Sequence, residues 1–296
     1  MLIRSCIKTG IANFFVASLL LVSAGCEKDS DITQNDIVSH QENINATVVK
    51  IVGRQQVISL PTGNYTYPVS QALLWSPVTY QNNPGTRKRF PLIFNLYGQS
   101  SCGTDITKLI ENKLMSCFIA RGFNATAVNP VDGKKYEFFV CSPQCPTSWG
   151  WSAPHVYNMI AQLKKLYPID TTRIYLTGCS CGGWGLWSCI TDINKLAEQI
   201  AAIIPISAAA ADHPDKLTNV GKYKIACLNI CGDQDAFYPD AVAYTKIINA
   251  ADPPIKAKLN TLWGVWHNAH CYAYDSAWNT MMGINIYEWM LQYKRE

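Results

Sequence analysis

The residue with the clearest potential for chemistry is Ser180, which has a glycine two positions before it and another two positions after it, in Gly178-Cys179-Ser180-Cys181-Gly182. An apolar run at 173–177 precedes this segment, and a helix-like run at 183–190 follows it. A turn that lifts a serine hydroxyl above a sheet leaves no room for side chains two positions away, so glycine suits both places. The pattern predicts a nucleophilic serine on a sharp strand-to-helix turn.

Such a serine needs a histidine to accept its proton and a carboxylate to orient that histidine. Two acids, Asp233 and Asp235, follow the apolar run at 225–230, and two histidines, His267 and His270, lie further along the chain. Register favours Asp235 as the acid and His267 as the base. Asp233 and His270 remain the alternatives, and His270 could instead contact the substrate.

The surrounding elements must bring these residues together. Apolar and β-branched runs alternate with helix-length segments, which predicts a mostly parallel sheet of eight strands with helices on both faces. The first two strands should pair antiparallel at one edge. Strands are expected at 48–60, 72–78, 92–96, 137–141, 173–177, 202–206, 225–230 and 258–263. Helices are expected at 106–121, 154–167, 183–190, 193–199, 240–250 and 276–292. The candidate serine, acid and histidine would then all follow strands at the carboxyl edge, where such sheets bind ligands.

At this point a family resemblance becomes specific. Residues 173–185 resemble the nucleophile segment of α/β-hydrolase esterases, in particular the polyhydroxybutyrate-depolymerase-like and feruloyl or acetylxylan esterase-like group. Four further segments resemble the family's segments in the same order along the chain: 91–98, 142–146, 232–235 and 267–269. The resemblance extends over residues 73–290. The resemblance implies an α/β-hydrolase fold without cofactor or metal, in which Ser180 is the nucleophile, Asp235 the acid and His267 the base.

The tetrahedral intermediate of ester cleavage needs two N–H donors for its oxyanion. The resemblance implies that the backbones of Gln99 and Cys181 supply them. This chain has Tyr97-Gly98 where the family usually has histidine-glycine, but backbone donors do not depend on that side chain. A thiol mechanism through Cys179 or Cys181 is disfavoured, because a sharp turn presents only its central residue.

Aromatic residues suggest how a substrate could be held. Trp149 and Trp151 lie in a loop after the fourth predicted strand, where they could wall an acyl or sugar pocket. The resemblance implies an acetyl or hydroxycinnamoyl ester, on a polysaccharide or as a small ester. Two alternatives stay open: a serine peptidase of the prolyl-peptidase type, and a catalytically inactive surface lipoprotein that binds glycans.

The first residues predict export. Arg4 and Lys8 precede an apolar run at 11–22, and small residues then lead to Cys26. This resembles a lipoprotein signal in which Cys26 receives the lipid. A transmembrane anchor is the alternative. Residues 27–45 are polar and acidic, which predicts a flexible tether, and residues 46–296 suit one catalytic domain. We therefore expect an exported lipoprotein on either face of the outer membrane of a Gram-negative bacterium, touching the membrane through its lipid only.

The net charge and the cysteine content bear on the expected partners and on the expected state of the thiols. The net charge of +4 comes without a basic stripe, so nucleic acid is not an expected partner. Twelve cysteines in an exported chain predict disulfides or buried thiols, and Cys231 with Cys271 is one candidate pair. A zinc site built from Cys141, Cys145, Cys227 and Cys231 is disfavoured, because residues four apart on a strand are about 13 Å from each other.

Overall fold

The computed structural model describes residues 49–60 and 63–296. The predicted signal peptide, the lipidated Cys26 and the tether at 27–45 lie outside the described residues. None of the helices in the described part is long and apolar enough to cross a membrane.

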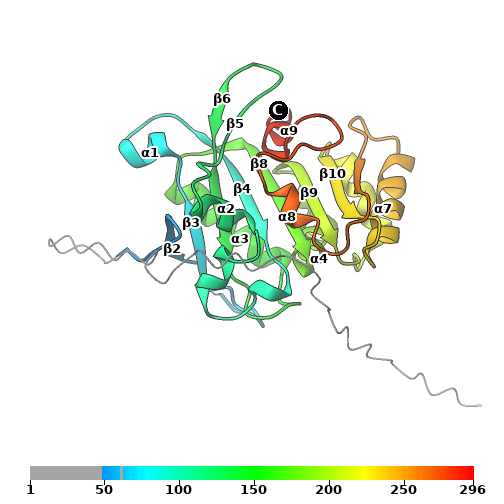
Figure 1. The fold of residues 1–296 in the computed structure, drawn as a ribbon, viewed down its shortest axis with the longest axis horizontal. Helices are drawn as coiled ribbons and strands as arrows, with labels where there is room; N and C mark the ends of the chain where they lie inside the picture. The colour runs from blue at the N-terminus through cyan, green and yellow to red at the C-terminus, as the bar shows by residue number, and fades with distance from the viewer. Residues whose placement is uncertain (1–48, 61–62) are drawn as a thin grey trace, which may run out of the picture.

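The centre of the domain is one nine-stranded sheet (Figure 1), with the order β1-β2-β3-β7-β4-β8-β9-β10-β11. Its strands are β1 (Ile51–Val52), β2 (Gln55–Ser59), β3 (Gln71–Trp75), β4 (Phe90–Leu96), β7 (Phe139–Pro143), β8 (Ile169–Ser180), β9 (Ile200–Ala208), β10 (Ala226–Gly232) and β11 (Lys258–Leu262). The pairs from β7 through β4 to β11 are parallel, whereas β1, β2 and β3 pair antiparallel at one edge. The predicted fold class is therefore confirmed.

The strand count differs from the predicted eight because the first expected strand is two. Gly53 and Arg54 both have a left-handed backbone, with φ values of 50° and 65°, and they turn the chain between β1 and β2. A separate two-stranded hairpin, β5 (Thr126–Val128) with β6 (Lys135–Glu137), was not predicted. Its strands are only three residues long, so they carry little pattern.

The helices lie on both faces of the sheet (Figure 1). They are α1 (Val78–Asn82), α2 (Met115–Ala120), α3 (Ala153–Leu166), α4 (Cys181–Thr191), α5 (Asn194–Ala197), α6 (Asn219–Lys222), α7 (Tyr238–Ala250), α8 (His270–Ala273) and α9 (Ile286–Leu291). One buried core contains residues of α3, α4 and α7, and a second contains residues of α2, α8 and α9. Each face of the sheet is thus covered by its own helices.

Two expected helices are shorter than predicted. The segment 106–121 breaks into a 3₁₀ helix, Ile106–Ile110, and α2, because Asn112 and Lys113 have φ values of 55° and 51°. The segment 276–292 is helical only in α9, which begins at the capping box of Asn285 and Glu288.

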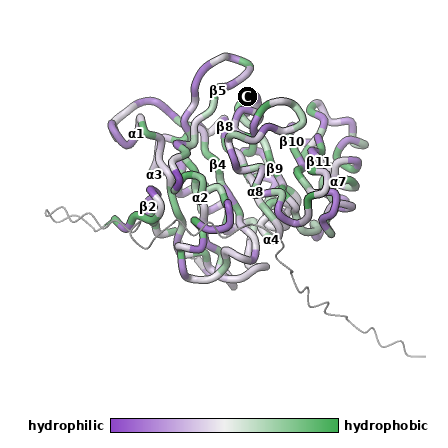
Figure 2. The backbone as a smooth tube through the Cα atoms, in the orientation of Figure 1, coloured by the Kyte–Doolittle hydropathy of each residue, from purple (hydrophilic) through white to green (hydrophobic). Residues whose placement is uncertain are grey.

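The central strands explain why the sheet is so regular. Every residue of β4, β9 and β10 is buried except the last of β9. Continuously buried runs of mostly apolar residues are typical of parallel strands covered on both sides. Figure 2 shows the hydrophobic colour concentrated along these strands and the hydrophilic colour along the outer loops. Because the strands are parallel, the ends of β8, β10 and β11 meet at one edge.

Candidate active site

Ser180 is the residue at which β8 passes into α4, and its backbone is strained. Its φ of 54° and ψ of −123° are unusual for a residue with a side chain. The flanking glycines are sterically required. A Cβ on Gly178 would lie 2.4 Å from the Gly182 carbonyl oxygen, and one on Gly182 would lie 2.0 Å from the Leu96 carbonyl oxygen. The turn therefore has the geometry expected from the sequence.

Three side chains form a hydrogen-bonded series at the carboxyl edge of the sheet. His267 Nε2 lies 2.9 Å from Ser180 Oγ, and His267 Nδ1 lies 3.0 and 3.1 Å from the two carboxylate oxygens of Asp235. An ionised carboxylate can only accept, so Nδ1 carries the hydrogen and Nε2 is left with a lone pair for the serine proton. The series can move a proton from serine to histidine.

The carboxylate of Asp235 is buried, only 5% exposed, yet held in its ionised form. Burial by itself raises the pKa of Asp235. The hydrogen bond from His267, the positive charge of that ring when it is protonated, and the hydrogen bond from the Phe237 N–H bring the pKa below its ordinary value. The Phe237 ring also packs edge-on against the His267 ring, with centroids 5.3 Å apart. Phe237 was not identified from the sequence as a site residue, because a phenylalanine two positions after an acid is not part of any recognisable motif.

The two alternatives lie outside this series. Asp233 accepts hydrogen bonds from the Gly264 N–H at 2.6 Å and from the Gln234 amide at 2.8 Å, and both hold the loop after β10 in place. His270 begins α8, where its Nε2 lies 3.5 Å from the Cys271 sulfur. Burial and the nearby His267 lower the pKa of His270 to about 4. Only Asp235 and His267 are brought into line with Ser180.

Gln99 and Cys181 lie where oxyanion donors are expected. Gln99 starts the 3₁₀ helix Gln99–Ser101 directly after β4, and Cys181 is the first residue of α4. Gly98 contacts the nucleophile turn, because a Cβ built on it would lie 2.9 Å from Ser180 Cβ. The two backbone segments that carry these donors therefore meet beside Ser180.

The Tyr97 side chain, which stands where the resembled family has histidine, points into the core. Its hydroxyl accepts a hydrogen bond from the Ser116 N–H at 2.9 Å and contacts the Ser142 hydroxyl at 3.4 Å. Its carbonyl accepts a hydrogen bond from Trp151 Nε1 at 3.1 Å. Trp151 is buried, so it braces this loop from inside and does not present its ring to a substrate.

Trp149, by contrast, is 57% exposed and packs edge-on against Trp184 of α4, with ring centroids 5.6 Å apart. Trp184 lies on α4 four residues after Ser180, so this aromatic pair packs on the helix that begins at the candidate nucleophile. Two more exposed tryptophans, Trp263 and Trp266, immediately precede the loop of His267. The edge that holds the candidate site is therefore rich in accessible indole rings.

The cysteines beside the nucleophile are protonated thiols. Burial raises the pKa of Cys179 to about 12 and also raises the pKa of Cys181. Neither sulfur would be a thiolate at neutral pH. The Ser180 hydroxyl, 4.0 Å from the Cys181 sulfur, is the group presented at the turn.

Of the two predicted states, disulfide or buried thiol, most of the described cysteines have the thiol state. Eight of them are free thiols: Cys102, Cys141, Cys145, Cys179, Cys181, Cys189, Cys227 and Cys231. The candidate pair of Cys231 with Cys271 is therefore wrong, because Cys231 is buried at the end of β10 as a thiol. Within the described residues no three His, Cys, Asp or Glu side chains are grouped to hold a metal ion.

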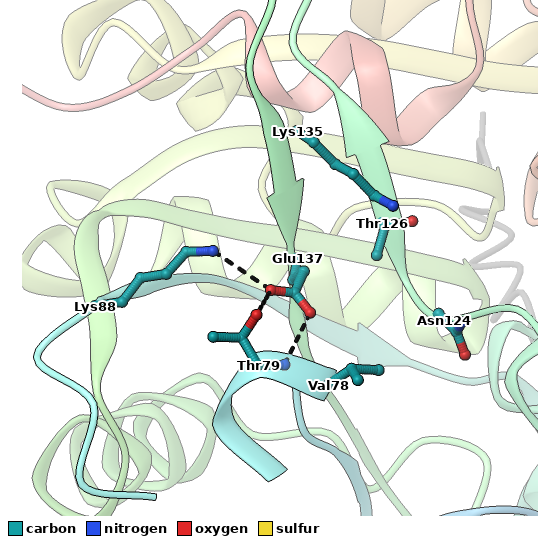
Figure 3. Close-up of a pocket in the computed structure, with 7 residues that line it drawn as sticks. All are labelled: Val78, Thr79, Lys88, Asn124, Thr126, Lys135 and Glu137. Carbon is teal, nitrogen blue, oxygen red and sulfur yellow. Dashed lines mark hydrogen bonds and ion pairs between the residues drawn. The ribbon is translucent and has the colours of Figure 1, made fainter. Parts of the chain in front are cut away.

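A separate pocket has a volume of about 450 Å³ and is lined by residues that include Thr79, Lys88 and Glu137 (Figure 3). Glu137 accepts hydrogen bonds there from the Thr79 N–H at 3.0 Å and from Lys88 at 3.4 Å. Lys88 precedes the start of β4 and Glu137 precedes the start of β7, so the pocket is at the amino ends of strands whose carboxyl ends face the serine. None of the predicted site residues lines it.

Comparison with known proteins supports the fold. No family model and no curated protein matches the chain. Among solved structures, a thermostable esterase superposes with a TM-score of 0.57 at 22% identity, over 88% of this chain and 64% of its own. The feruloyl esterase module from Clostridium thermocellum, complexed with sinapinate, superposes with a TM-score of 0.53 at 12% identity, over 81% of this chain and 93% of its own.

A fluorophosphonate-binding serine hydrolase of Staphylococcus aureus matches at a TM-score of 0.52 and 14% identity, over 80% of this chain and 98% of its own. The chain has the α/β-hydrolase fold. Its strand-to-helix serine, its acid after β10 and its histidine after β11 occupy the order in which this fold carries a nucleophile, an acid and a base. The chain spans less than two thirds of the thermostable esterase, so the likeness concerns architecture.

Proposed function

We propose that this protein is a serine hydrolase that cleaves carboxylic esters. The observation that carries the proposal is the hydrogen-bonded series of Ser180, His267 and Asp235 on a strained turn of an α/β-hydrolase fold. No cofactor or metal enters the proposed reaction.

Each residue has a definite part in the reaction. His267 Nε2 takes the proton from Ser180 Oγ as the oxygen attacks the ester carbonyl, and Asp235 stabilises the imidazolium that forms. The backbone N–H groups of Gln99 and Cys181 donate to the oxyanion of the tetrahedral intermediate. His267 then protonates the leaving alcohol, and an acyl-serine remains. Water, activated by the same histidine, releases the acid.

For the substrate we propose an acetyl or hydroxycinnamoyl ester, attached to a polysaccharide. One solved relative of the same fold is named a feruloyl esterase module and was determined with sinapinate. The exposed rings of Trp149, Trp263 and Trp266 support a substrate with flat or ring-shaped parts, since indole faces offer large apolar contact areas.

The location of the enzyme is part of the proposal. We expect residues 1–26 to direct export, with lipid on Cys26 and the tether at 27–45 holding the domain to the outer membrane. Replacing Cys26 by serine should release the protein from the membrane fraction of expressing cells. Retention of the Cys26→Ser variant in that fraction would favour a transmembrane anchor.

Activity is tested with p-nitrophenyl acetate and methyl ferulate, using the protein without residues 1–26. The Ser180→Ala variant should lose at least about 10³-fold in kcat and should no longer react with a fluorophosphonate. Ser188→Ala is the matched control, because Ser188 lies on the same helix and its hydroxyl donates to the Trp184 carbonyl of that helix. Equal and negligible rates in wild type and Ser180→Ala would reject an esterase, and peptide substrates and glycan binding would then separate the peptidase from the inactive binding protein.

A further inference from the structure

Two thiols, those of Cys102 and Cys145, come from different loops. Cys102 lies in the loop that follows β4, three residues after the proposed oxyanion donor Gln99. Cys102 directly follows the 3₁₀ helix Gln99–Ser101, and Cys145 follows the end of β7. Both are free, Cys102 being partly exposed and Cys145 buried. The proposed reaction uses neither of them.

One backbone hydrogen bond and one side-chain hydrogen bond hold the two segments together. The Gly103 N–H donates to the Cys145 carbonyl at 3.0 Å. On the other side of Cys102, the Ser101 carbonyl accepts a hydrogen bond from the side-chain amide of Gln144 at 3.1 Å. Backbone segments joined by an N–H···O=C bond run about 5 Å apart, and a disulfide joins Cα atoms about 4.4–6.8 Å apart. The backbone bond beside Cys102 therefore brings it near Cys145, at a separation that a disulfide can span.

The two sulfurs also have suitable surroundings. The Cys102 thiol donates to the Gly98 carbonyl at 3.5 Å, so its side chain lies on the inner side of the loop. The Cys145 sulfur is enclosed by its own following turn, since a Cβ on Gly150 would lie 2.9 Å from it. Burial raises the pKa of Cys102 to about 11 and also raises the pKa of Cys145. Repulsion from nearby sulfurs, those of Cys145 and Cys181 for Cys102 and that of Cys181 for Cys145, raises both pKa values further.

Cys181 is the competing partner, and its contacts argue against it. Its sulfur lies against the Gln99 N–H and 4.0 Å from Ser180 Oγ, inside the proposed oxyanion site. No backbone hydrogen bond of the described residues ties Cys181 to Ser101 or Gly103. A bond to Cys181 would have to pull α4 and this loop together across the place where the reaction occurs.

We propose that Cys102 and Cys145 form a reversible disulfide that fastens the loop carrying Gln99 to the segment leading to Trp149. The oxidant is a disulfide compound such as oxidised glutathione. The more accessible Cys102 loses its proton and attacks the glutathione disulfide, which forms a mixed disulfide and releases one glutathione thiol. The deprotonated Cys145 then attacks the Cys102 sulfur and releases the second glutathione. Two protein thiols are oxidised, and one glutathione disulfide is reduced to two thiols.

The test is a disulfide map of the wild-type protein after incubation with oxidised glutathione at pH 8.5. This alkaline pH increases the thiolate fraction of the two cysteines, which speeds the exchange. Free thiols are blocked with iodoacetamide under denaturing conditions, and unreduced peptides are identified by mass spectrometry. The expected result is a linked pair of the Cys102 and Cys145 peptides, two hydrogens lighter than their sum, with the Cys181 and Cys189 peptides alkylated. Reduction with dithiothreitol should return both peptides to the alkylated form.

Two variants sharpen the test. Cys102→Ala should abolish the link and leave Cys145 alkylated, whereas the matched control Cys189→Ala, in the buried part of α4, should keep it. Oxidation should raise the thermal midpoint of the wild type by about 5–10 °C and should not raise that of Cys102→Ala. A link from Cys102 to Cys181, or a stable mixed disulfide on Cys102 with Cys145 still alkylated, would overturn the proposal. Because the map measures no turnover, its outcome is independent of the proposed esterase activity.

Discussion

Gly98 lies directly against Ser180. A Cβ added to Gly98 would come within 2.9 Å of the Ser180 Cβ and 3.2 Å of the Cys179 carbonyl oxygen. The close approach of these two residues brings the loop after β4 to the nucleophile turn, so that Gln99 follows at the position proposed for an oxyanion donor. The distance between two backbones, rather than any side-chain contact, sets this part of the site.

Replacing Gly98 by alanine should therefore impair catalysis. The added methyl group has to push the loop away from Ser180, which misplaces a donor, and losing one such donor lowers kcat about 10²-fold. The measurement is steady-state hydrolysis of p-nitrophenyl acetate. Gly85→Ala is the control, because a Cβ there meets its nearest atom only at 3.6 Å. An unchanged kcat in Gly98→Ala would show that the loop does not supply a donor.

The assignment of the acid can be tested by exchanging carboxylates for amides. Asp235→Asn should lower kcat about 10⁴-fold, because an amide can favour the wrong tautomer of His267 and cannot stabilise the imidazolium. Asp233→Asn should retain most of the activity, since Asp233 bonds Gly264 and Gln234 but not the histidine. The reverse order of effects would make Asp233 the acid.

His270 predicts a loss of stability in mild acid. Its pKa is lowered to about 4 in the folded protein, against about 6.5 in an unfolded chain. Between these two pH values His270 binds a proton in the unfolded chain but not in the folded protein. The free energy of unfolding therefore falls as the pH drops from about 6.5 to about 4. The loss from this residue should be at most about 3 kcal/mol.

Urea unfolding at pH 7 and pH 4.5 measures this effect. His270→Gln should lose less stability between the two pH values than the wild type, and the exposed control His213→Gln should behave like the wild type. Asp235 adds little loss between these two pH values, in all three proteins. Its folded pKa is lowered, so its contribution is present above the unfolded pKa of about 3.9 and is lost only as the pH falls further, through the folded pKa. Equal losses in wild type and His270→Gln would contradict the prediction.

Trp149 should matter for large substrates and not for small ones. Trp149→Ala removes an exposed ring that packs on Trp184, on the helix that begins at Ser180. We expect kcat/KM on feruloylated arabinoxylan to fall about 3- to 10-fold, with kcat/KM on p-nitrophenyl acetate unchanged. Leu166→Ala, an exposed position at the end of α3, is the control. Equal reductions on both substrates would indicate damage to the site itself.

The sequence by itself determined the class of the fold and the position of the proposed nucleophile. Ser180 could be found because its turn needs glycine at 178 and 182, a local requirement written in adjacent residues. The buried parallel strands were visible because β4, β9 and β10, covered on both faces, are mostly apolar. The division of the first strand at Gly53 and Arg54 was not visible, because a left-handed arginine leaves no pattern in the sequence.

Only the tertiary structure placed Asp235 rather than Asp233, and His267 rather than His270, in the hydrogen-bonded series with Ser180. It also showed that Trp149 is exposed whereas Trp151 is buried. In each pair the two residues have the same chemistry and lie within three positions of each other, so spacing along the chain could not separate them. Their roles differ in direction and in burial: Asp235 turns to the histidine while Asp233 turns to Gly264, and Trp151 is buried while Trp149 is exposed. Such differences arise when distant strands and loops pack against one another, because packing fixes where each side chain points.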